Sequence, residues 1–246
     1  MLLYFEKLVC RFSNEIICVS PSLLEKASEL KLTKPAKLHC IGSGSSNGIN
    51  TDKFQHVASK EMSVLPIDSK DQVIGYVGRL TKDKGIDDLV EAFLLLKETF
   101  PMLKLLLVGR LDKDHGLRAN TMIKIKMHQD IILLNFQKEV APFYKKIQVF
   151  VFPTHREGFG NVAMEAAYSG LPVVATNVTG AKDTVVHGET GLLTEARNPE
   201  ELERAIASLL HNPEKASKMG IEGKRRVEVE FKRENVWQGI LAMYEL

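Results

Sequence analysis

Two glutamates and two glycines stand close together in the second half of the chain, in a pattern suited to ligand binding. Glu157 and Glu165 are separated by seven residues, and Gly158 and Gly160 lie between them. Glycines leave the backbone accessible because they carry no Cβ, and the free N–H groups of a helix expected to begin near Asn161 favour an anion. A phosphate repels carboxylates, so the glutamates are better suited to accept hydrogen bonds from neutral hydroxyl groups. These residue types predict a ligand that joins a phosphate to a polyol.

The elements that position this stretch are a strand before it and a helix after it. The apolar run Val149–Phe152 predicts a buried strand, and 162–169 favours a helix. A similar alternation recurs along the chain. Strands are expected over 15–20, 37–41, 73–79, 104–109, 131–134 and 172–176, and helices over 1–12, 22–30, 87–100, 115–129, 140–145, 200–211, 213–230 and 233–246. This order predicts an α/β fold, a Rossmann-like, doubly wound parallel sheet with helices on both faces.

Cations follow the strand expected over 73–79. Arg79 ends this strand, and Lys82 and Lys84 stand in the loop before the next helix. Open α/β sheets bind ligands at the carboxyl ends of their strands, so Arg79 and Lys84 are candidates for contacting an anion. From the residues alone, the favoured interpretation of the two lysines is that they are solvated loop charges.

Several other residues that could take part in chemistry are expected to have structural roles instead. Asp112 or Asp114 is expected to cap the helix over 115–129, because two loop carboxylates are too few to hold a metal ion. His155 is expected to pack the loop or to contact a sugar. The glycines over 42–48 do not form the Gly-x-Gly-x-x-Gly fingerprint, which argues against a dehydrogenase. A glycan hydrolase with a pair of catalytic carboxylates would not need a phosphate-binding loop.

The composition is that of an ordinary globular protein. The chain has 246 residues, of which 44% are hydrophobic and 26% charged, and its net charge of +2 gives no reason to expect a nucleic acid partner. Cys10, Cys18 and Cys40 lack Cys-x-x-Cys spacing, which argues against a disulfide framework and a zinc site and favours a reducing cytoplasm. The apolar stretch 1–11 is interrupted by charges, so neither a signal peptide nor a membrane span is expected there.

The stretch from Glu157 to Glu165 resembles the Glu–seven residues–Glu signature of retaining glycosyltransferases of the GT-B fold, in particular glycosyltransferase family 4 (group 1). Two further blocks, 169–176 and 187–193, are similar to that family's small-residue helix end, buried strand and glycine turn. The resemblance covers about residues 17–195, with the blocks in the family's order. It implies that the chain is one half of a GT-B fold and binds a nucleotide-sugar donor, expected to be a UDP-sugar.

The resemblance also implies roles for the residues of the site. Arg79 and Lys84 would hold the donor diphosphate, Glu157 would contact hydroxyl groups of the donor sugar, and Glu165 would hold the ribose. The expected catalytic residues are therefore Glu157, Arg79 and Lys84. The other expected donor-binding residues are Gly158, Phe159, Gly160, Asn161, Asn135 and Phe136, of which the last two stand where the family contacts the base. Neither glutamate is expected to be a general acid, and no cofactor or metal is expected.

The family's order of elements implies three parts. Residues 1–20 would be a remnant of an N-terminal acceptor domain and its crossover, 21–230 the donor-binding Rossmann-like domain, and 231–246 a C-terminal crossover helix. The implied function is retaining transfer of a sugar to a glycan or lipid-linked acceptor in bacterial cell-surface polysaccharide synthesis, for capsule or lipopolysaccharide. The expected location is the cytoplasm, including the inner face of the cytoplasmic membrane.

An alternative from another class is left open. Because most of the N-terminal domain is expected to be missing, the chain is also interpreted as a catalytically incomplete half that binds a nucleotide sugar and needs a separate chain for the first half. Transfer that appears only when such a chain is added would identify this alternative. A nucleotide-sugar epimerase of similar fold would be distinguished by its product.

Overall fold

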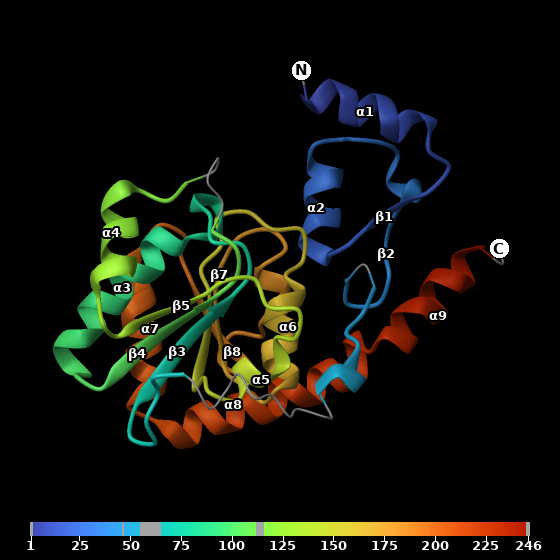
Figure 1. The fold of residues 1–246 in the computed structure, drawn as a ribbon. Coiled ribbons are helices and arrows are strands. Elements are labelled where there is room, and N and C mark those ends of the chain that lie inside the picture. The colour runs from blue at the N-terminus through green and yellow to red at the C-terminus, as the bar shows by residue number, and fades with distance from the viewer. Residues whose placement is uncertain (1, 46, 55–64, 112–115, 245–246) are drawn as a thin grey trace.

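A sheet of six parallel strands forms the centre of the molecule, in the order β5-β4-β3-β6-β7-β8 (Figure 1). The computed structural model describes residues 2–45, 47–54, 65–111 and 116–244. The strands are β3 (Gln72–Val77), β4 (Leu103–Val108), β5 (Ile131–Leu134), β6 (Val149–Phe152), β7 (Val173–Thr176) and β8 (Gly191–Thr194). The chain runs outward from β3 to β5 and then crosses back to β6, so the strand order reverses between β3 and β6. The predicted doubly wound α/β fold is confirmed.

Helices cover both faces of this sheet (Figure 1). On one face α3 packs against α7 and α4, and on the other face α6 packs against α8, with α5 nearby. The helices are α3 (Ile86–Thr99), α4 (Ala119–Met127), α5 (Ala141–Tyr144), α6 (Asn161–Tyr168), α7 (Pro199–Leu210) and α8 (Pro213–Arg226). Because both faces are covered, the central strands are apolar along their length, and Ile74 and Phe150 are fully buried.

A second, smaller sheet lies beside the first. Its two strands, β1 (Ile16–Cys18) and β2 (Leu38–Cys40), are parallel and are accompanied by α1 (Leu2–Phe12) and α2 (Pro21–Glu29). The boundary expected between residues 20 and 21 does not agree with this pairing, because it separates β1 from β2. These two strands and α2 form one βαβ unit, in which the crossover helix packs on both strands and keeps them together.

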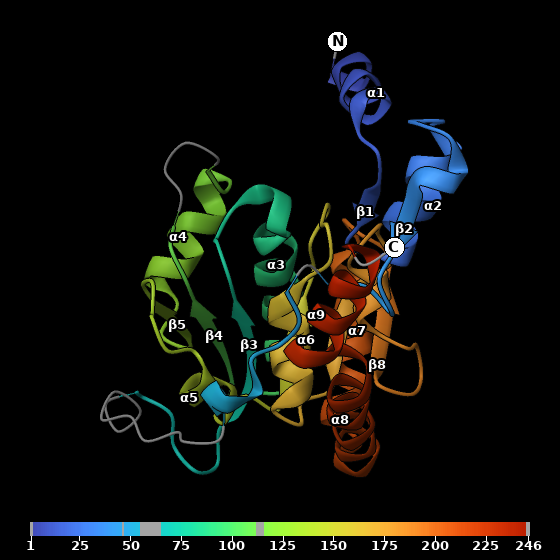
Figure 2. The same cartoon turned by 90° about the vertical axis from the view of Figure 1, so that its right-hand side faces the viewer.

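The last helix lies near β2 of the smaller sheet (Figures 1 and 2). α9 (Arg233–Tyr244) follows a π-helical turn, Val227–Phe231, that ends α8. The backbone N–H of Ile49 donates to the last carbonyl of this turn at 2.7 Å. The amphipathic face expected for α9 is covered only in part, since Val236 is buried whereas Trp237 is 49% exposed.

The helix expected after Asp114 begins later than the sequence pattern suggests. α4 starts at Ala119, and Arg118 stands at its N-cap without a capping side-chain hydrogen bond. The backbone N–H of Arg118 donates to Asp87 Oδ1 at 3.1 Å, so a carboxylate of α3 fixes the chain just before the helix. The expected cap at 112 or 114 is therefore wrong for this helix start, and both residues lie outside the described part of the chain.

Two other helix starts agree with the sequence. The Ser20 hydroxyl accepts a hydrogen bond from the N–H of Leu23 at 3.2 Å at the start of α2. Asn198 Oδ1 accepts one from the N–H of Glu201 at 3.1 Å, and Pro199 opens α7. Across the described ranges, none of the helices is both long and apolar enough to cross a membrane.

Candidate functional site

The candidate site lies where β3 and β6, neighbours in the centre of the sheet, come to an end. The loop after β3 carries Arg79 and then the short 3-10 helix η4 (Lys82–Lys84). The loop after β6 carries Glu157 and leads into α6. Two groups of residues that are far apart in the sequence are thus brought to one crevice, at the point where the strand order reverses.

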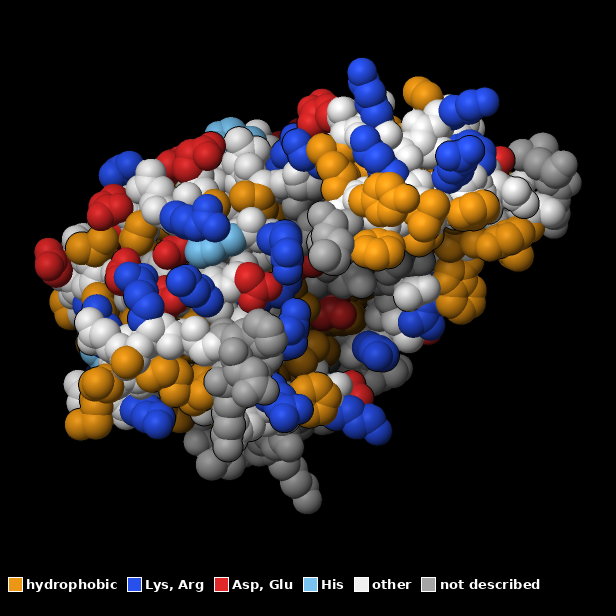
Figure 3. Space-filling model, turned by 90° about the horizontal axis from the view of Figure 1, so that it is seen from above, with side chains coloured by type: hydrophobic (Ala, Val, Ile, Leu, Met, Phe, Trp, Pro, Cys, Tyr) orange, Lys and Arg blue, Asp and Glu red, His pale blue; other side chains and the backbone are white. Residues whose placement is uncertain are grey.

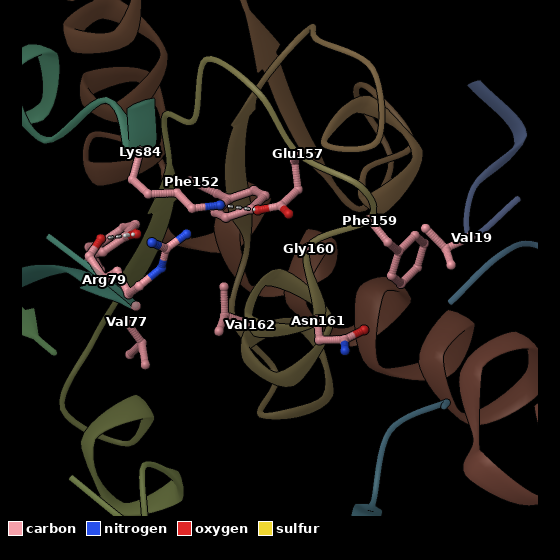
Figure 4. A pocket seen from close by; sticks show the side chains of 12 residues that line it. Val19, Val77, Arg79, Lys84, Phe152, Glu157, Phe159, Gly160, Asn161 and Val162 are labelled. Atoms are coloured by element: carbon pink, nitrogen blue, oxygen red, sulfur yellow. Dashed lines mark hydrogen bonds and ion pairs between the residues drawn. The ribbon is translucent and has the colours of Figure 1, made fainter. Parts of the chain in front are cut away.

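A pocket of about 280 Å³ opens between these two loops (Figure 4). The residues predicted from the sequence that line it are Arg79, Lys84, Glu157, Phe159, Gly160 and Asn161. The lining residues that were not predicted are Val19, Tyr76, Val77, Gly78, Phe152 and Val162. Most of the latter stand at or just after the ends of β3 and β6, and that position is the signal that could have identified them. Val19 also stands just after a strand, but this strand is β1 of the smaller sheet, so its place in the pocket depends on how the two sheets pack.

Lys84 and Glu157 form an ion pair across the pocket. Lys84 Nζ lies 2.6 Å from Glu157 Oε2, and the two side chains are only 14% and 20% exposed. The other carboxylate oxygen of Glu157 accepts a hydrogen bond from the N–H of Gly158 at 3.0 Å. Partial burial strengthens the attraction between the two charges compared with an open surface. Glu157 is therefore the anion that Lys84 holds in this structure.

Arg79 borders the same pocket from the side of β3. The Tyr76 hydroxyl donates to the backbone carbonyl of Arg79 at 3.0 Å, which fixes the chain at this position. In Figure 4 the guanidinium points toward the pair formed by Lys84 and Glu157. Within the described ranges it makes no ion pair with a carboxylate. Arg79 thus presents hydrogen-bond donors in a planar fork that suits a phosphate.

Two glycines of the loops are required by the protein's own packing. Gly85 has φ 68°, and a Cβ at this position would lie 1.8 Å from the carbonyl oxygen of Pro153. Gly160 has φ 98°, and a Cβ there would lie 2.6 Å from the ring of Phe152. The missing side chain of Gly160 therefore leaves room for a neighbouring ring, which differs from the role expected from the sequence. Gly158 is not restricted in this way, since the atom nearest to an added Cβ is 3.5 Å away.

Glu165 is not among the residues that line this pocket. It lies half-buried on α6, where one carboxylate oxygen accepts a hydrogen bond from the Tyr144 hydroxyl at 3.1 Å. Burial raises the pKa of Glu165, and the hydrogen bond from Tyr144 and the charge of Lys53 oppose this rise in part. The two glutamates of the sequence motif therefore occupy different environments, one paired with a cation and one partly desolvated beside a tyrosine.

The residues expected to contact a base lie farther away. Asn135 and Phe136 follow β5, the edge strand, which is separated from β3 by β4. Both are exposed, and the side chain of Phe136 is 73% exposed. They belong to the same carboxyl edge of the sheet as the pocket but do not line it.

His155 ties the two loops to the helix behind them. Its Nε2 lies 2.6 Å from Asp88 Oδ2, with both side chains largely buried. Its backbone N–H donates to the carbonyl of Asp83 at 2.8 Å. These contacts agree with the expectation that His155 packs the loop. Within the part of the chain that the structure describes, no group of three or more His, Cys, Asp or Glu side chains is placed to hold a metal ion.

A doubly wound parallel sheet with two cations and a helix start at its reversal point defines the chain as an open α/β domain whose candidate ligand site lies at the carboxyl ends of the strands. Comparison with known proteins then gives the family. Residues 57–226 match the family described as Glycosyl transferases group 1, so the chain belongs to this family. The resemblance found in the sequence is thereby confirmed at the level of the group 1 family.

Several relatives match almost the whole chain. The capsular polysaccharide biosynthesis glycosyltransferase CapM of Staphylococcus aureus is 37% identical over 99% of this chain and 64% of its own length. The sucrose-phosphate synthase of Thermosynechococcus elongatus is 28% identical, with a TM-score of 0.84 over 99% of this chain and 60% of its own. HepE of Anabaena, solved with UDP and glucose, is 20% identical with a TM-score of 0.84 over 99% and 66%. The chain thus spans less than two thirds of each relative.

Proposed function

We propose that this chain is the donor-binding part of a retaining glycosyltransferase of family 4, which transfers a sugar from a UDP-sugar during synthesis of a bacterial cell-surface polysaccharide. The observation that carries the proposal is the convergence of Arg79, Lys84 and Glu157 on one pocket at the reversal point of the sheet. The similarity to CapM supports the polysaccharide, and the UDP and glucose bound by HepE support the donor class.

The cations serve the departure of the diphosphate. When the bond between the anomeric carbon and the diphosphate oxygen breaks, negative charge builds up on the leaving group, so fixed cations at that point lower the barrier. Arg79 offers its donors directly. Lys84 exchanges the carboxylate of Glu157 for a phosphate oxygen, and this exchange frees Glu157 to accept hydrogen bonds from the hydroxyl groups of the donor sugar.

The remaining donor contacts are proposed along the same edge. Glu165 accepts hydrogen bonds from the ribose hydroxyl groups, for which it retains a free oxygen beside the one that Tyr144 contacts. The backbone from Gly158 to Asn161 faces the diphosphate at the start of α6. Asn135 and Phe136 approach the base from the end of β5.

A second candidate function is a nucleotide-sugar-binding half that is inactive by itself. The chain spans 64% of the length of CapM. In this candidate, transfer to a saccharide or lipid-linked saccharide requires a separate polypeptide that supplies the first half of the enzyme. Both candidates require the same donor pocket, and they differ in whether the purified chain turns over a UDP-sugar.

The proposal is tested by calorimetric titration with UDP, GDP, ADP and NAD. We expect saturable binding of UDP. Arg79→Ala and Lys84→Ala should each raise the Kd for UDP by about 10- to 100-fold, because each variant loses a charge-assisted hydrogen bond to phosphate. Glu165→Ala should weaken UDP but not inorganic pyrophosphate, which has no ribose.

Arg204→Ala is the matched control, since Arg204 is exposed on α7 and lies outside the pocket. Its Kd for UDP should equal that of the parent chain. If Arg79→Ala and Lys84→Ala both bind UDP as the parent does, the two cations do not hold the diphosphate. Binding of NAD in preference to every nucleoside diphosphate would contradict the transferase proposal and favour an oxidoreductase.

A further inference from the structure

A second and larger pocket lies next to the donor pocket. Its volume is about 900 Å³, which is within the range of small-molecule sites. Arg79, Lys82, Asp83, His155, Arg156 and Arg197 line it. Figure 3 looks onto the ends of the strands and shows several Lys and Arg side chains gathered on this face. No role in the proposed donor site accounts for Lys82, Arg156 or Arg197.

The two pockets share a wall built from the loops after β3 and β6. On η4, Lys82 lines the larger pocket and Lys84 the donor pocket. On the other loop, Arg156 lines the larger pocket and Glu157 the donor pocket. Arg79 borders both. The loops are joined where backbone and side-chain donors of the second loop contact the Asp83 carbonyl, at 2.8 and 3.2 Å.

The charge of the larger pocket is strongly positive. Four of its lining side chains are exposed cations, and within the described ranges none of the four forms an ion pair with a carboxylate. Its single carboxylate, Asp83, accepts a hydrogen bond from the Thr81 hydroxyl at 2.6 Å. By contrast, Arg118 on the same side of the sheet is paired with Asp87 and Glu91. The cations of the pocket are thus available to an outside anion.

Arg197 has an unusual backbone that supports a function. Its φ of 62° lies in the left-handed region, which side chains other than glycine and asparagine rarely adopt. It stands in the loop after β8, whereas the other three cations stand after β3 and β6. A strained loop residue that adds a cation to a pocket built mainly by other loops is the kind of feature found at binding sites.

We infer that the larger pocket binds an anionic saccharide, one that carries carboxylate or phosphate groups, beside the donor site. Its cations are spread over three loops, so they suit several anionic groups along one ligand better than a single small anion. This inference rests on the proposed function in one respect: with a sugar donor in the adjoining pocket, which shares Arg79, the anionic saccharide is the acceptor. Arg79 then stands where the two ligands meet.

The test uses the full chain and an oligogalacturonate as the anionic probe, with a neutral malto-oligosaccharide of the same length for comparison. We expect the oligogalacturonate to bind and to weaken as salt is added, because exposed charges are screened. Arg156→Gln and Arg197→Asn should each weaken it about three- to tenfold. Asparagine at 197 removes the charge yet tolerates the left-handed backbone.

Lys82 and Lys84 allow the two pockets to be tested separately, because each lysine lines a different one. Lys82→Gln should raise the Kd for the oligogalacturonate and leave the Kd for UDP unchanged. Lys84→Gln should raise the Kd for UDP. Arg204→Gln, an exposed arginine elsewhere, should change neither. Failure of UDP to bind while the anionic probe still responds to Arg156→Gln would overturn the donor proposal and leave this site standing.

Three results would overturn the anionic-saccharide site itself. The first is equal binding of the neutral oligosaccharide. The second is an oligogalacturonate Kd that neither Arg156→Gln nor Arg197→Asn changes. The third is complete displacement of the oligogalacturonate by inorganic phosphate at an equal concentration, because the pocket would then be a site for a small anion.

Discussion

Gly85 shows how a single residue sets the distance between the two loops of the site. Its φ of 68° and the 1.8 Å approach of an added Cβ to the Pro153 oxygen mean that two separate conditions exclude a side chain. Gly188 meets only one of them. Its φ is 83°, but nothing lies within 4 Å of an added Cβ. The two positions therefore separate the cost of the backbone conformation from the cost of the contact.

Gly188→Ala is expected to lower the free energy of unfolding by about 1 kcal/mol, the cost of a left-handed alanine. Gly85→Ala should lower it by about 3 kcal/mol or more, because η4 must also move away from the end of β6. Urea unfolding of the two variants and the parent measures both losses. Equal losses would mean that the loop adapts to a side chain at 85 without strain.

Glu165 makes the free energy of unfolding depend on pH. Burial raises its pKa above the ordinary value of 4.5, so the folded chain holds this proton more tightly than the unfolded chain does. The free energy of unfolding therefore falls as pH rises from about 4.5 through the raised folded pKa. Above that pKa the contribution of Glu165 no longer changes. Glu165→Gln should flatten this fall and be at least as stable as the parent at pH 7, although it should bind UDP more weakly.

Unfolding measured at several pH values between 4 and 8 checks this expectation. Glu98→Gln serves as the control, because Glu98 is exposed on α3 and its replacement should leave the pH profile of the parent unchanged. A glutamine at 165 that keeps the parent's pH dependence would show that another group causes the fall.

The residues of the site were predictable only to the extent that they follow strands. Arg79 and Glu157 were candidates because each follows an apolar run, whereas Lys84 was selected only through the resemblance to the glycosyltransferase family. The structure brings all three to one pocket. The ion pair between Lys84 and Glu157 could not be predicted, since it depends on β3 and β6 being neighbours. Val19 follows β1 of the other sheet, and the sequence does not show that the two sheets meet at this pocket.

Among the elements, α2 contacts the main body through hydrogen bonds of Ser22 and through an ion pair between Glu25 and Lys182 at 3.8 Å. Ser22 is buried, and its hydroxyl donates to the carboxylate of Asp183 in the loop between β7 and β8. The same hydroxyl accepts a hydrogen bond from the N–H of Gly180 at 2.7 Å. The smaller sheet is thus held to the large one by a polar contact near the helix start.

Ser22→Ala is expected to lower the free energy of unfolding by about 1 to 3 kcal/mol, because the N–H of Gly180 loses its acceptor and the Asp183 carboxylate loses one of its donors. Ser28→Ala on the exposed side of the same helix is the control and should cost less than about 0.5 kcal/mol. Thermal unfolding of both variants decides the matter. A loss at Ser22 no greater than at Ser28 would mean that the Ser22 hydroxyl does not help to hold α2 to the main body.

The existence of the elements was easier to predict than their ends and partners. The strand Val149–Phe152 and the helix after it match the sequence pattern, since their apolar periodicity is strong. The start of α4 was missed because a side chain from another helix, Asp87, fixes the turn before it. The pairing of β1 with β2 was missed because strands this short carry no mark of their partner.

At the scale of the whole molecule, one surface departs from the rest. The exposed apolar side chains of α1 are Leu3, Tyr4, Phe5, Leu8, Val9 and Phe12. Hydrophobic side chains gather in this part of the molecule toward the upper right of Figure 3. A contiguous patch of this kind is uncommon on a monomeric protein. Isolated apolar residues elsewhere, such as Ile123 and Met127 on α4, provide a comparison.

We expect the double variant Tyr4→Ser and Phe12→Ser to lower the fluorescence of bound anilinonaphthalene sulfonate, because this dye brightens on contiguous apolar surface. Ile123→Ser and Met127→Ser remove a similar amount of exposed apolar area from α4 and should change the signal less. Titration of the dye against each folded variant compares them. An equal decrease in both would show that α1 is not a distinct surface.

In the ion pair between Lys84 and Glu157, the carboxylate of Glu157 competes with any anionic ligand for Lys84. Because both groups belong to one chain, the local concentration of the carboxylate at Lys84 stays high at any dilution of the protein. A ligand gains only the difference between its own attraction to the lysine and that of the glutamate it displaces. Chloride or a lone carboxylate gains little from this exchange, whereas a diphosphate, with more charge and more acceptor oxygens, still gains. The ion pair therefore selects anions by their charge and number of acceptor oxygens, independently of the shape of the ligand.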